Sequence, residues 1–165
     1  MGSIAGGEAT TAREVVEAFI ARGVTAATAE SLTAGLVAAT IADVAGASAM
    51  LRGGVVSYSS EVKADVLGVS RELLDAAGSV DAEVARQMAD GARRVCGADY
   101  GVATTGVAGP EPHDGKPVGT VFVAVAGPTG TTVGSYRFDG DRPAIRTAAT
   151  RAALVRLLEA LRADA

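Results

Sequence analysis

Two short segments of this chain carry side chains that can perform acyl-transfer chemistry. Residues 28–35 read Thr-Ala-Glu-Ser-Leu-Thr-Ala-Gly, and residues 53–63 read Gly-Gly-Val-Val-Ser-Tyr-Ser-Ser-Glu-Val-Lys. Each segment lies where an expected strand runs into an expected helix, and together they offer serines, Tyr58 and Lys63. An uncharged lysine can act as general base for a serine nucleophile, so this set needs no histidine.

The scarcity of other reactive residues narrows the alternatives. His113 is the single histidine and Cys96 the single cysteine, which excludes a zinc site built only from those two residue types. A Ser-His-Asp triad would have to use His113. The chain has neither asparagine nor tryptophan. Donors to an oxyanion must therefore come mainly from backbone N–H groups or from Ser and Thr hydroxyls.

Lys63 is the candidate base. We expect it in the first turn of a short helix that starts at Glu61, where the helix dipole and burial would both lower its pKa. A lysine must lose about three pKa units to act as a base near neutrality, which corresponds to roughly 4 kcal/mol. The competing interpretation is a solvated lysine at the start of a helix, the commoner situation for this residue type.

Two serines compete to be the partner of this lysine. Ser60 stands three residues before Lys63, the spacing of an S-x-x-K motif on one helix face. Ser31 ends a strand and precedes a helix, where the N–H groups of Leu32, Thr33 and Ala34 can face an oxyanion. The competing interpretation of Ser31 is a helix N-cap, the commoner role for a serine in this position. The spacing from Lys63 therefore favours Ser60 as its partner, whereas the position between a strand and a helix favours Ser31.

Other residues suggest how a substrate is held. Tyr58 can relay a proton or stack on a flat ring, or it can be half-buried packing. The small residues of 104–110 form a loop that can approach a phosphate closely. Arg142, beside an expected helix start, is a candidate phosphate or carboxylate clamp, although it can instead pair with Asp139 or Asp141. Glu111, His113 and Asp114 could contact a metal ion, but their place on one loop makes only a weak case for a metal site.

The elements that must position these residues indicate one α/β domain. The chain has 165 residues, and 48% of them are apolar, enough for a substantial core. Strands expected at 24–29, 55–58 and 100–105 alternate with helices, while 118–126 and 131–138 form a hairpin. This order predicts a three-layer α/β/α sandwich over a mixed, mostly parallel sheet with one antiparallel hairpin. Residues 1–10 are expected to be a flexible tail before a domain of residues 11–165.

Helix signals in the sequence refine that plan. Thr11 to Glu14 reads as a capping box that opens the first helix, and Gly23 follows that helix as a C-cap. Residues 33–44 are apolar nearly all round and predict a buried helix. Ser70 is expected to begin a short helix that ends at Gly78, and Asp81 is expected to cap a longer helix. A final helix is expected to run to about Leu161 and to present a stripe toward the core, made of Ile145, Ala149, Ala152, Val155 and Leu158.

Charge and cysteine content bear on partners and location. The net charge of −4 argues against a general nucleic-acid-binding role, which needs a basic face. No apolar run reaches membrane-spanning length, so we expect no membrane partner. One cysteine permits no intrachain disulfide, which fits a cytoplasmic location. The abundance of Ala and Val favours self-association into a homo-oligomer.

Five segments, in order, give the chain a resemblance to the CinA carboxy-terminal domain family, the PncC-type nicotinamide-nucleotide amidohydrolases. They are residues 28–35, 56–64, 105–110 and 116–121, and the Gly-Asp-Arg of residues 140–142. The resemblance covers about residues 11–162. It implies deamidation of nicotinamide mononucleotide to nicotinate mononucleotide and ammonia without metal or cofactor. A catalytically inactive, nucleotide-binding regulatory module is the alternative.

The resemblance also implies roles for individual residues. By position, Ser31 is the nucleophile, Lys63 its base and Tyr58 the assisting hydroxyl. The implied substrate-binding residues are Glu30, Thr33, Gly35, Thr105, Gly106 and Arg142. The family usually has Asn where this chain has Ser60, which disfavours Ser60 as nucleophile. It usually has Cys-Thr-Gly-Gly after the serine, so Ala34 adds a methyl group near the expected oxyanion pocket.

Overall fold

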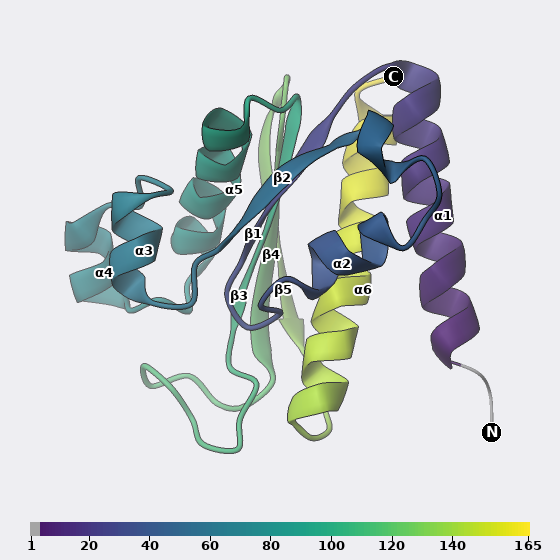
Figure 1. The fold of residues 1–165 in the computed structure, drawn as a ribbon. Coiled ribbons are helices and arrows are strands. Elements are labelled where there is room, and N and C mark those ends of the chain that lie inside the picture. The colour runs from purple at the N-terminus through teal and green to yellow at the C-terminus, as the bar shows by residue number, and fades with distance from the viewer. Residues whose placement is uncertain (1–3) are drawn as a thin grey trace.

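A computed structural model describes residues 4–165, with side chains from residue 11 onward. The chain forms α/β architecture with helices on both faces of one sheet (Figure 1). The strands are β1 (Ala26–Glu30), β2 (Leu51–Val56), β3 (Tyr100–Gly106), β4 (Thr120–Gly127) and β5 (Gly130–Arg137). The helices are α1 (Ile4–Arg22), α2 (Leu36–Ala42), α3 (Ser60–Asp65), α4 (Arg71–Ala77), α5 (Ala82–Cys96) and α6 (Arg142–Ala163), with a 3-10 turn, η1, at Ala47–Ala49.

The sheet is mixed, as the sequence predicts. Its strand order is β2-β1-β3-β4-β5. β1 runs parallel to both β2 and β3, whereas β4 is antiparallel to β3 and to β5. Only β4 therefore opposes the common direction, and the sheet is mostly parallel. The antiparallel hairpin of β4 and β5 turns tightly, since Gly127 pairs with Gly130.

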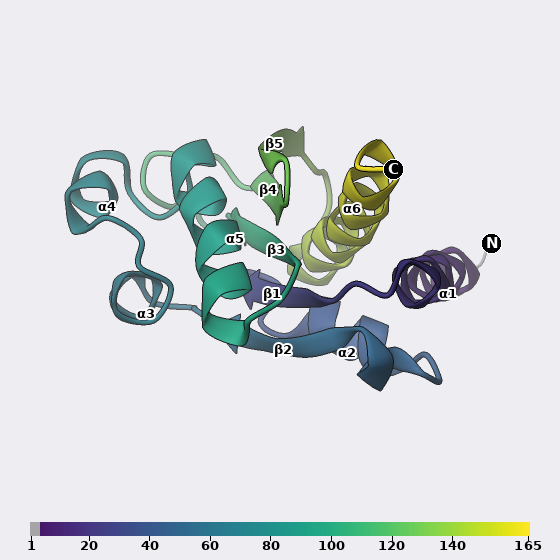
Figure 2. The ribbon, with the colours of Figure 1, turned by 90° about the horizontal axis from the view of Figure 1, so that it is seen from above.

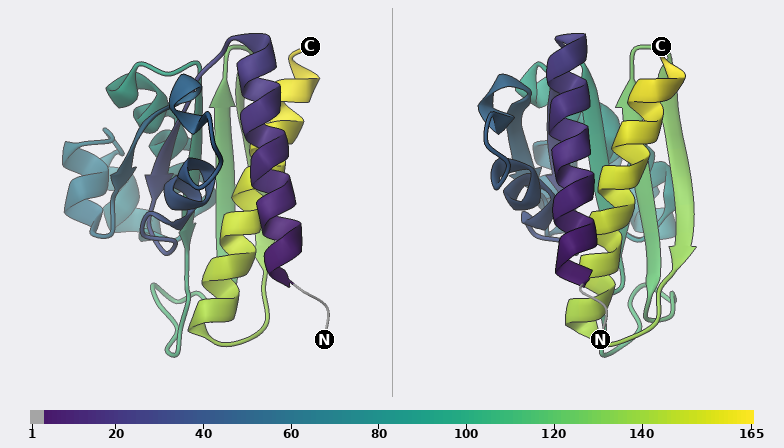
Figure 3. Two further views of the ribbon diagram at one scale, coloured as in Figure 1. Left: turned by 45° about the vertical axis from the view of Figure 1, so that its right-hand side comes forward. Right: turned by 90° about the vertical axis from the view of Figure 1, so that its right-hand side faces the viewer.

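The helices form the two outer layers of the sandwich. Figure 2 shows α1, α2 and α6 on one side of the sheet and α5 on the other, with α3 and α4 beyond α5. The long helices α1 and α6 lie side by side, as both views in Figure 3 show. The core under α1 and α6 contains Phe19 packed edge-to-face on Tyr100 at 5.3 Å between ring centroids. The core under α5 is mainly Ala, with Met88 and Leu67.

Several helix boundaries follow the sequence signals. Asp81 caps α5 by accepting hydrogen bonds from the backbone N–H groups of Glu83 and Val84. Ser70 caps α4 through the N–H of Leu73, and Gly23 follows α1 with a positive φ of 65°. These caps are local interactions between residues close in sequence, which is why the sequence alone predicts them.

Other boundaries and faces differ from the prediction. The first helix begins at Ile4 rather than at the capping box of Thr11, so residues 4–10, expected in a flexible tail, are helical; residues 1–3 lie outside the described part. In α2 only Val37 and Ile41 are buried, so this helix is not enclosed on all sides. The buried face of α6 includes Ile145, Ala149 and Leu158 of the predicted stripe, and Ala152 is partly buried against the same core. Val155 is exposed, contrary to the prediction, and Ala153, Leu154 and Leu157 are buried in addition.

In residues 4–165 no helix is long and apolar enough to cross a membrane.

Candidate active site

The site lies where the three parallel strands end. β1, β2 and β3 finish side by side at Glu30, Val56 and Gly106, so the residues that follow them meet at one edge of the sheet. In open α/β sheets this carboxyl edge is the usual place for a ligand. A cavity of about 330 Å³ opens here, and its lining includes Ser31, Leu32, Tyr58, Gly106 and Arg142.

Lys63 and Ser31 contact each other beside this cavity. The Lys63 side chain is fully buried, and its Nζ donates to Ser31 Oγ at 2.9 Å and to the Ser57 carbonyl at 2.6 Å. Ser60, the alternative partner, is exposed at the start of α3. The structure thus brings the lysine to Ser31, the serine favoured by its setting rather than by its spacing.

Burial is the main cause of the shifted pKa of Lys63. Desolvation lowers the pKa of Lys63 to about 8, while the carboxylate of Asp114 opposes the shift. The prediction that the helix dipole also lowers this pKa is wrong, because Lys63 lies in the last turn of the six-residue α3 rather than in its first turn. An amine with this pKa is partly neutral near physiological pH and can accept a proton from the hydroxyl it contacts.

Glu30 organises the segment behind Ser31. It is 2% exposed, and its carboxylate accepts hydrogen bonds from Thr33 Oγ1 at 2.6 Å and from the N–H groups of Val37 and Ala38 at 2.8 and 3.1 Å. The carboxylate therefore satisfies the first free N–H groups of α2 and complements its dipole. Thr33 Oγ1 also bonds Thr104 Oγ1 at 2.8 Å. The side chains of Glu30 and Thr33, expected to bind substrate, are buried and do not line the cavity.

The turn between Ser31 and α2 differs from the direct strand-to-helix junction that we expected. The helix starts only at Leu36, after Gly35 with φ of 101°. Gly35 is outside the cavity lining. The N–H of Ala34 donates to the Ser31 carbonyl at 3.1 Å, so it is unavailable to an oxyanion. Ala34 has a φ of 49° and is exposed, so its methyl group does not reach the cavity as the sequence comparison suggested.

Tyr58 and Arg142 form the rim of the cavity. Tyr58 is 58% exposed rather than half-buried packing, and its hydroxyl accepts from Arg142 Nη2 at 2.6 Å. Arg142 Nη1 donates to the Gly109 carbonyl at 2.6 Å, so the arginine is held by the loop after β3 and not by Asp139 or Asp141. Its charge therefore faces no carboxylate partner among the hydrogen bonds and ion pairs of the described residues.

Thr105 and Gly106, the two residues at the end of β3 that were expected to bind substrate, have different environments. Thr105 is 1% exposed and donates to the Ser79 carbonyl at 2.6 Å, so its side chain is used inside the protein. Gly106 lines the cavity. A Cβ atom at Gly106 would lie 2.7 Å from the Thr120 carbonyl oxygen, which explains why a glycine is needed here.

The loop 107–119 closes one side of the cavity and is tied down at its far end. Asp114 accepts from the N–H of Ser79 at 2.8 Å, and Lys116 donates to the Val80 carbonyl at 3.2 Å. His113 lies in the lining, 3.4 Å from the Asp114 carboxylate. Within residues 11–165 no group of three or more His, Cys, Asp or Glu side chains is placed to hold a metal ion.

Sequence reasoning missed Arg146. Its guanidinium, on the second turn of α6, donates to the carbonyls of Leu32 and Thr33 directly after Ser31. The only available signal was its spacing, four residues after Arg142 and so on the same helix face. Nothing in the sequence indicates that this face of α6 meets a turn more than a hundred residues earlier.

Comparison with known proteins finds relatives of this chain. Residues 8–161 match the model of the CinA C-terminal domain. The chain is 54% identical over 140 residues to a CinA-like protein of Frankia casuarinae, covering 85% of this chain and 32% of the relative. It is 49% identical over 152 residues to a CinA-like protein of Geobacter sulfurreducens, covering 92% of this chain and 37% of the relative. The chain therefore spans about a third of the length of these relatives.

Solved structures match the whole fold. The competence/damage inducible protein CihA from Agrobacterium tumefaciens superposes with a TM-score of 0.91 at 38% identity, over 98% of this chain and 99% of that chain. A CinA superfamily protein from Klebsiella pneumoniae gives a TM-score of 0.90 at 36% identity, over 94% of this chain and 98% of that chain.

Proposed function

We propose that this chain, which belongs to the CinA C-terminal domain family, hydrolyses the carboxamide of nicotinamide mononucleotide to give nicotinate mononucleotide and ammonia. The observation that carries the proposal is the 2.9 Å contact between Ser31 Oγ and a fully buried lysine amine whose pKa is lowered to about 8. The substrate follows from the sequence resemblance, and the Ser-Lys chemistry follows from the contact.

The reaction proceeds through an acyl-enzyme. Neutral Lys63 takes the Ser31 proton while Oγ forms a bond to the carboxamide carbon, and the C=O electron pair moves onto oxygen. When the tetrahedral intermediate collapses, the C–N bond breaks and Lys63 returns the proton to the leaving amine, which departs as ammonia. Water then attacks the ester, passes a proton to Lys63, and the C–Oγ bond breaks as Ser31 is protonated again. The sum is amide plus water to acid plus ammonia.

The cavity supplies the remaining contacts in this proposal. A pyridinium ring is cationic, so it disfavours an ammonium beside it and suits a neutral Lys63. Of the two phosphate-binding candidates, Arg142 is preferred, because its guanidinium stands exposed at the rim whereas the Thr105 hydroxyl is already bonded within the protein. In this proposal Tyr58, whose hydroxyl accepts a hydrogen bond from Arg142, assists proton transfer or covers the ring.

Ammonia release from nicotinamide mononucleotide is the direct test. We expect Ser31→Ala and Lys63→Ala to lose at least about a thousandfold in kcat, as is usual when a nucleophile or its base is removed. Ser60→Ala is the matched control, since this hydroxyl is exposed and lies on the same short helix as Lys63, and it should keep full activity. Full activity in Ser31→Ala, or loss only in Ser60→Ala, would refute the assignment.

The pH dependence of the wild-type rate provides a second check. Because the base must be uncharged, kcat/KM should rise about tenfold per pH unit below a pKa near 8 and level off above it. A flat profile between neutrality and pH 8 contradicts a lysine base.

The same assay separates the alternatives. Saturable nucleotide binding without turnover favours an inactive regulatory module, and a panel of small amides and esters would reveal a different substrate. Self-association and a cytoplasmic setting remain predictions from composition. Light scattering during size-exclusion chromatography tests the self-association.

A further inference from the structure

Arg146 makes a contact with the turn behind the nucleophile that the proposed reaction has not yet used. Its Nε donates to the Leu32 carbonyl at 2.9 Å and its Nη2 to the Thr33 carbonyl at 3.1 Å. The side chain is partly buried between α6 and this turn. A planar guanidinium that binds two successive carbonyls fixes the orientation of two successive peptide groups.

Fixing these carbonyls also fixes the N–H groups beside them. In a trans peptide the C=O of one residue and the N–H of the next point in opposite directions. With the Leu32 carbonyl held by Arg146, the Thr33 N–H points away from α6. The Thr33 carbonyl held by Arg146 fixes the Ala34 N–H, which donates to the Ser31 carbonyl. The Leu32 N–H, on the opposite side of that peptide group, therefore points out of the turn. Neither of these two N–H groups donates to a protein acceptor within the described residues.

Two free, oriented donors beside a nucleophile are what an oxyanion needs, and Leu32 lines the cavity together with Ser31. We propose that Arg146 is a positioning residue that pre-organises the N–H groups of Leu32 and Thr33 to stabilise the oxyanion formed when Ser31 attacks a carbonyl. The proposal rests on the proposed function for its substrate. Arg146 also places a positive charge beside the Leu32 carbonyl, whose negative end would otherwise be free to turn toward the oxyanion.

Kinetics of Arg146 variants test this role against a merely structural one. Loss of one oxyanion donor costs about 10²–10³ in kcat. We therefore expect Arg146→Met to lower kcat by about ten- to a hundredfold while KM changes less than about twofold. Arg146→Lys should lose less, since an ammonium can still hold one carbonyl. The control is Arg151→Met, because Arg151 is exposed on the same helix and makes no hydrogen bond or ion pair among the described residues. An unchanged kcat, or a change in KM alone, overturns the proposal.

A second readout does not depend on the identity of the substrate. Pyridine-3-boronic acid adds to a serine when Oγ donates a lone pair to boron and the serine proton passes to Lys63, which leaves a tetrahedral, anionic boronate. Isothermal titration calorimetry should show binding to the wild type and to Arg151→Met, with about tenfold weaker binding to Arg146→Met. If Arg146→Met fails to fold, as thermal melting would show, Arg146→Lys serves in both measurements.

The two measurements keep the two proposals distinguishable. A wild-type protein that binds the boronate in an Arg146-dependent way but releases no ammonia would refute the proposed substrate and retain the role of Arg146. Equal boronate affinity in wild type and Arg146→Met, or no affinity in wild type, would overturn the role of Arg146 whatever the substrate is.

Discussion

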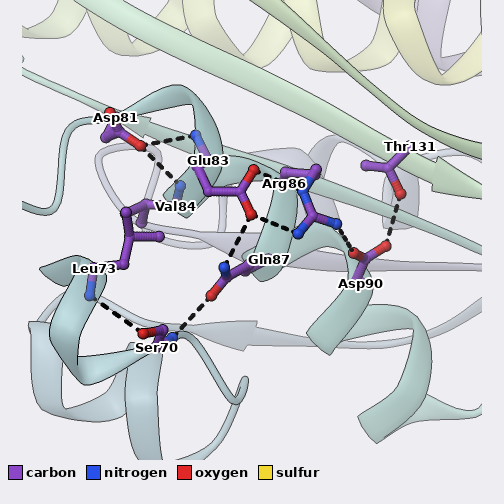
Figure 4. A network of polar contacts seen from close by, with 9 residues as sticks. All are labelled: Ser70, Leu73, Asp81, Glu83, Val84, Arg86, Gln87, Asp90 and Thr131. Atoms are coloured by element: carbon purple, nitrogen blue, oxygen red, sulfur yellow. Dashed lines mark hydrogen bonds and ion pairs between the residues drawn. The ribbon is translucent and has the colours of Figure 1, made fainter. Parts of the chain in front are cut away.

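Two polar networks in this molecule are built around a glutamate, and they differ in almost everything else. The network at the carboxyl edge joins Glu30, Thr33 and Thr104 in the interior next to Ser31 and Lys63. The α5 network joins Glu83, Arg86, Gln87 and their neighbours on the surface (Figure 4). The Glu30 residue is 2% exposed, whereas the Glu83 side chain is 44% exposed.

The partners of the two carboxylates differ accordingly. Glu83 is paired with a guanidinium: Arg86 donates to it through Nε at 2.8 Å and also bonds Asp90. Glu30 is held by a hydroxyl and two backbone N–H groups, all of them neutral. Water can replace the contacts of the α5 network at little cost, but it cannot reach Glu30. The exposed network therefore lies on the outer face of a helix, while the buried one fixes the backbone next to the contact between Ser31 and Lys63.

Lys63→Met should produce the largest effect in this comparison, because it changes activity as well as stability. The folded pKa of about 8 lies below the unfolded value of 10.5, so the unfolded chain binds more protons between these pH values. Wild-type stability therefore rises with pH through that window, and the full penalty, about 3 kcal/mol, acts below pH 8. Removing the amine relieves the penalty at the loss of about 1 kcal/mol from its hydrogen bonds. We expect an inactive variant that is more stable near neutrality, with a difference that shrinks as pH approaches 10.5.

Urea denaturation at a series of pH values measures this difference. The chain has one other lysine, Lys116, which is only partly buried and bonds the Val80 carbonyl. Lys116→Met is therefore the control, and we expect its difference in stability from the wild type not to shrink as the pH rises. A Lys63→Met difference that stays constant with pH would mean that the amine is not desolvated.

Glu30→Gln tests the buried network directly. The amide keeps one oxygen but presents an NH₂ group to donors that need an acceptor, so at least one buried hydrogen bond is lost and a donor faces a donor. We expect destabilisation of about 2–3 kcal/mol in urea denaturation. Glu61→Gln, at an exposed glutamate in the first turn of α3, should cost well under 1 kcal/mol. Equal costs for the two variants would remove the distinction between buried and exposed carboxylates.

Glu83→Gln should have the smallest effect. Hydrogen bonds from Arg86 and Gln87 lower the pKa of Glu83 to about 2, so its stabilisation is present above the ordinary carboxyl pKa and is lost as pH falls from 4.5 toward 2. Because the side chain is exposed, solvent screening reduces this stabilisation to less than about 1 kcal/mol. Thermal melts at neutral and acidic pH, at low and high salt, measure it. A large loss that is insensitive to salt would contradict the assignment of this network to the surface.

The same contrast explains what the sequence could predict. The caps of α4 and α5 and the β4–β5 hairpin are formed by residues near one another in the chain, and the sequence predicts all of them. The start of α2 depends on Glu30, whose carboxylate reaches the N–H groups of residues seven and eight positions later, so an apolar pattern alone made that helix too long. The Ser31–Lys63 contact was expected only through a family resemblance, since spacing favoured Ser60. Arg146 joins the site only after α6 packs, which no local pattern indicates.

The bond from Arg146 to Leu32 links positions 114 residues apart, and the Ser31–Lys63 contact links positions 32 apart through two different strands. A site assembled from such distant segments disappears whenever either partner detaches. Catalytic turnover would then serve as a reporter of the whole fold, falling in step with the cooperative denaturation transition instead of surviving in a fragment or a partly ordered intermediate.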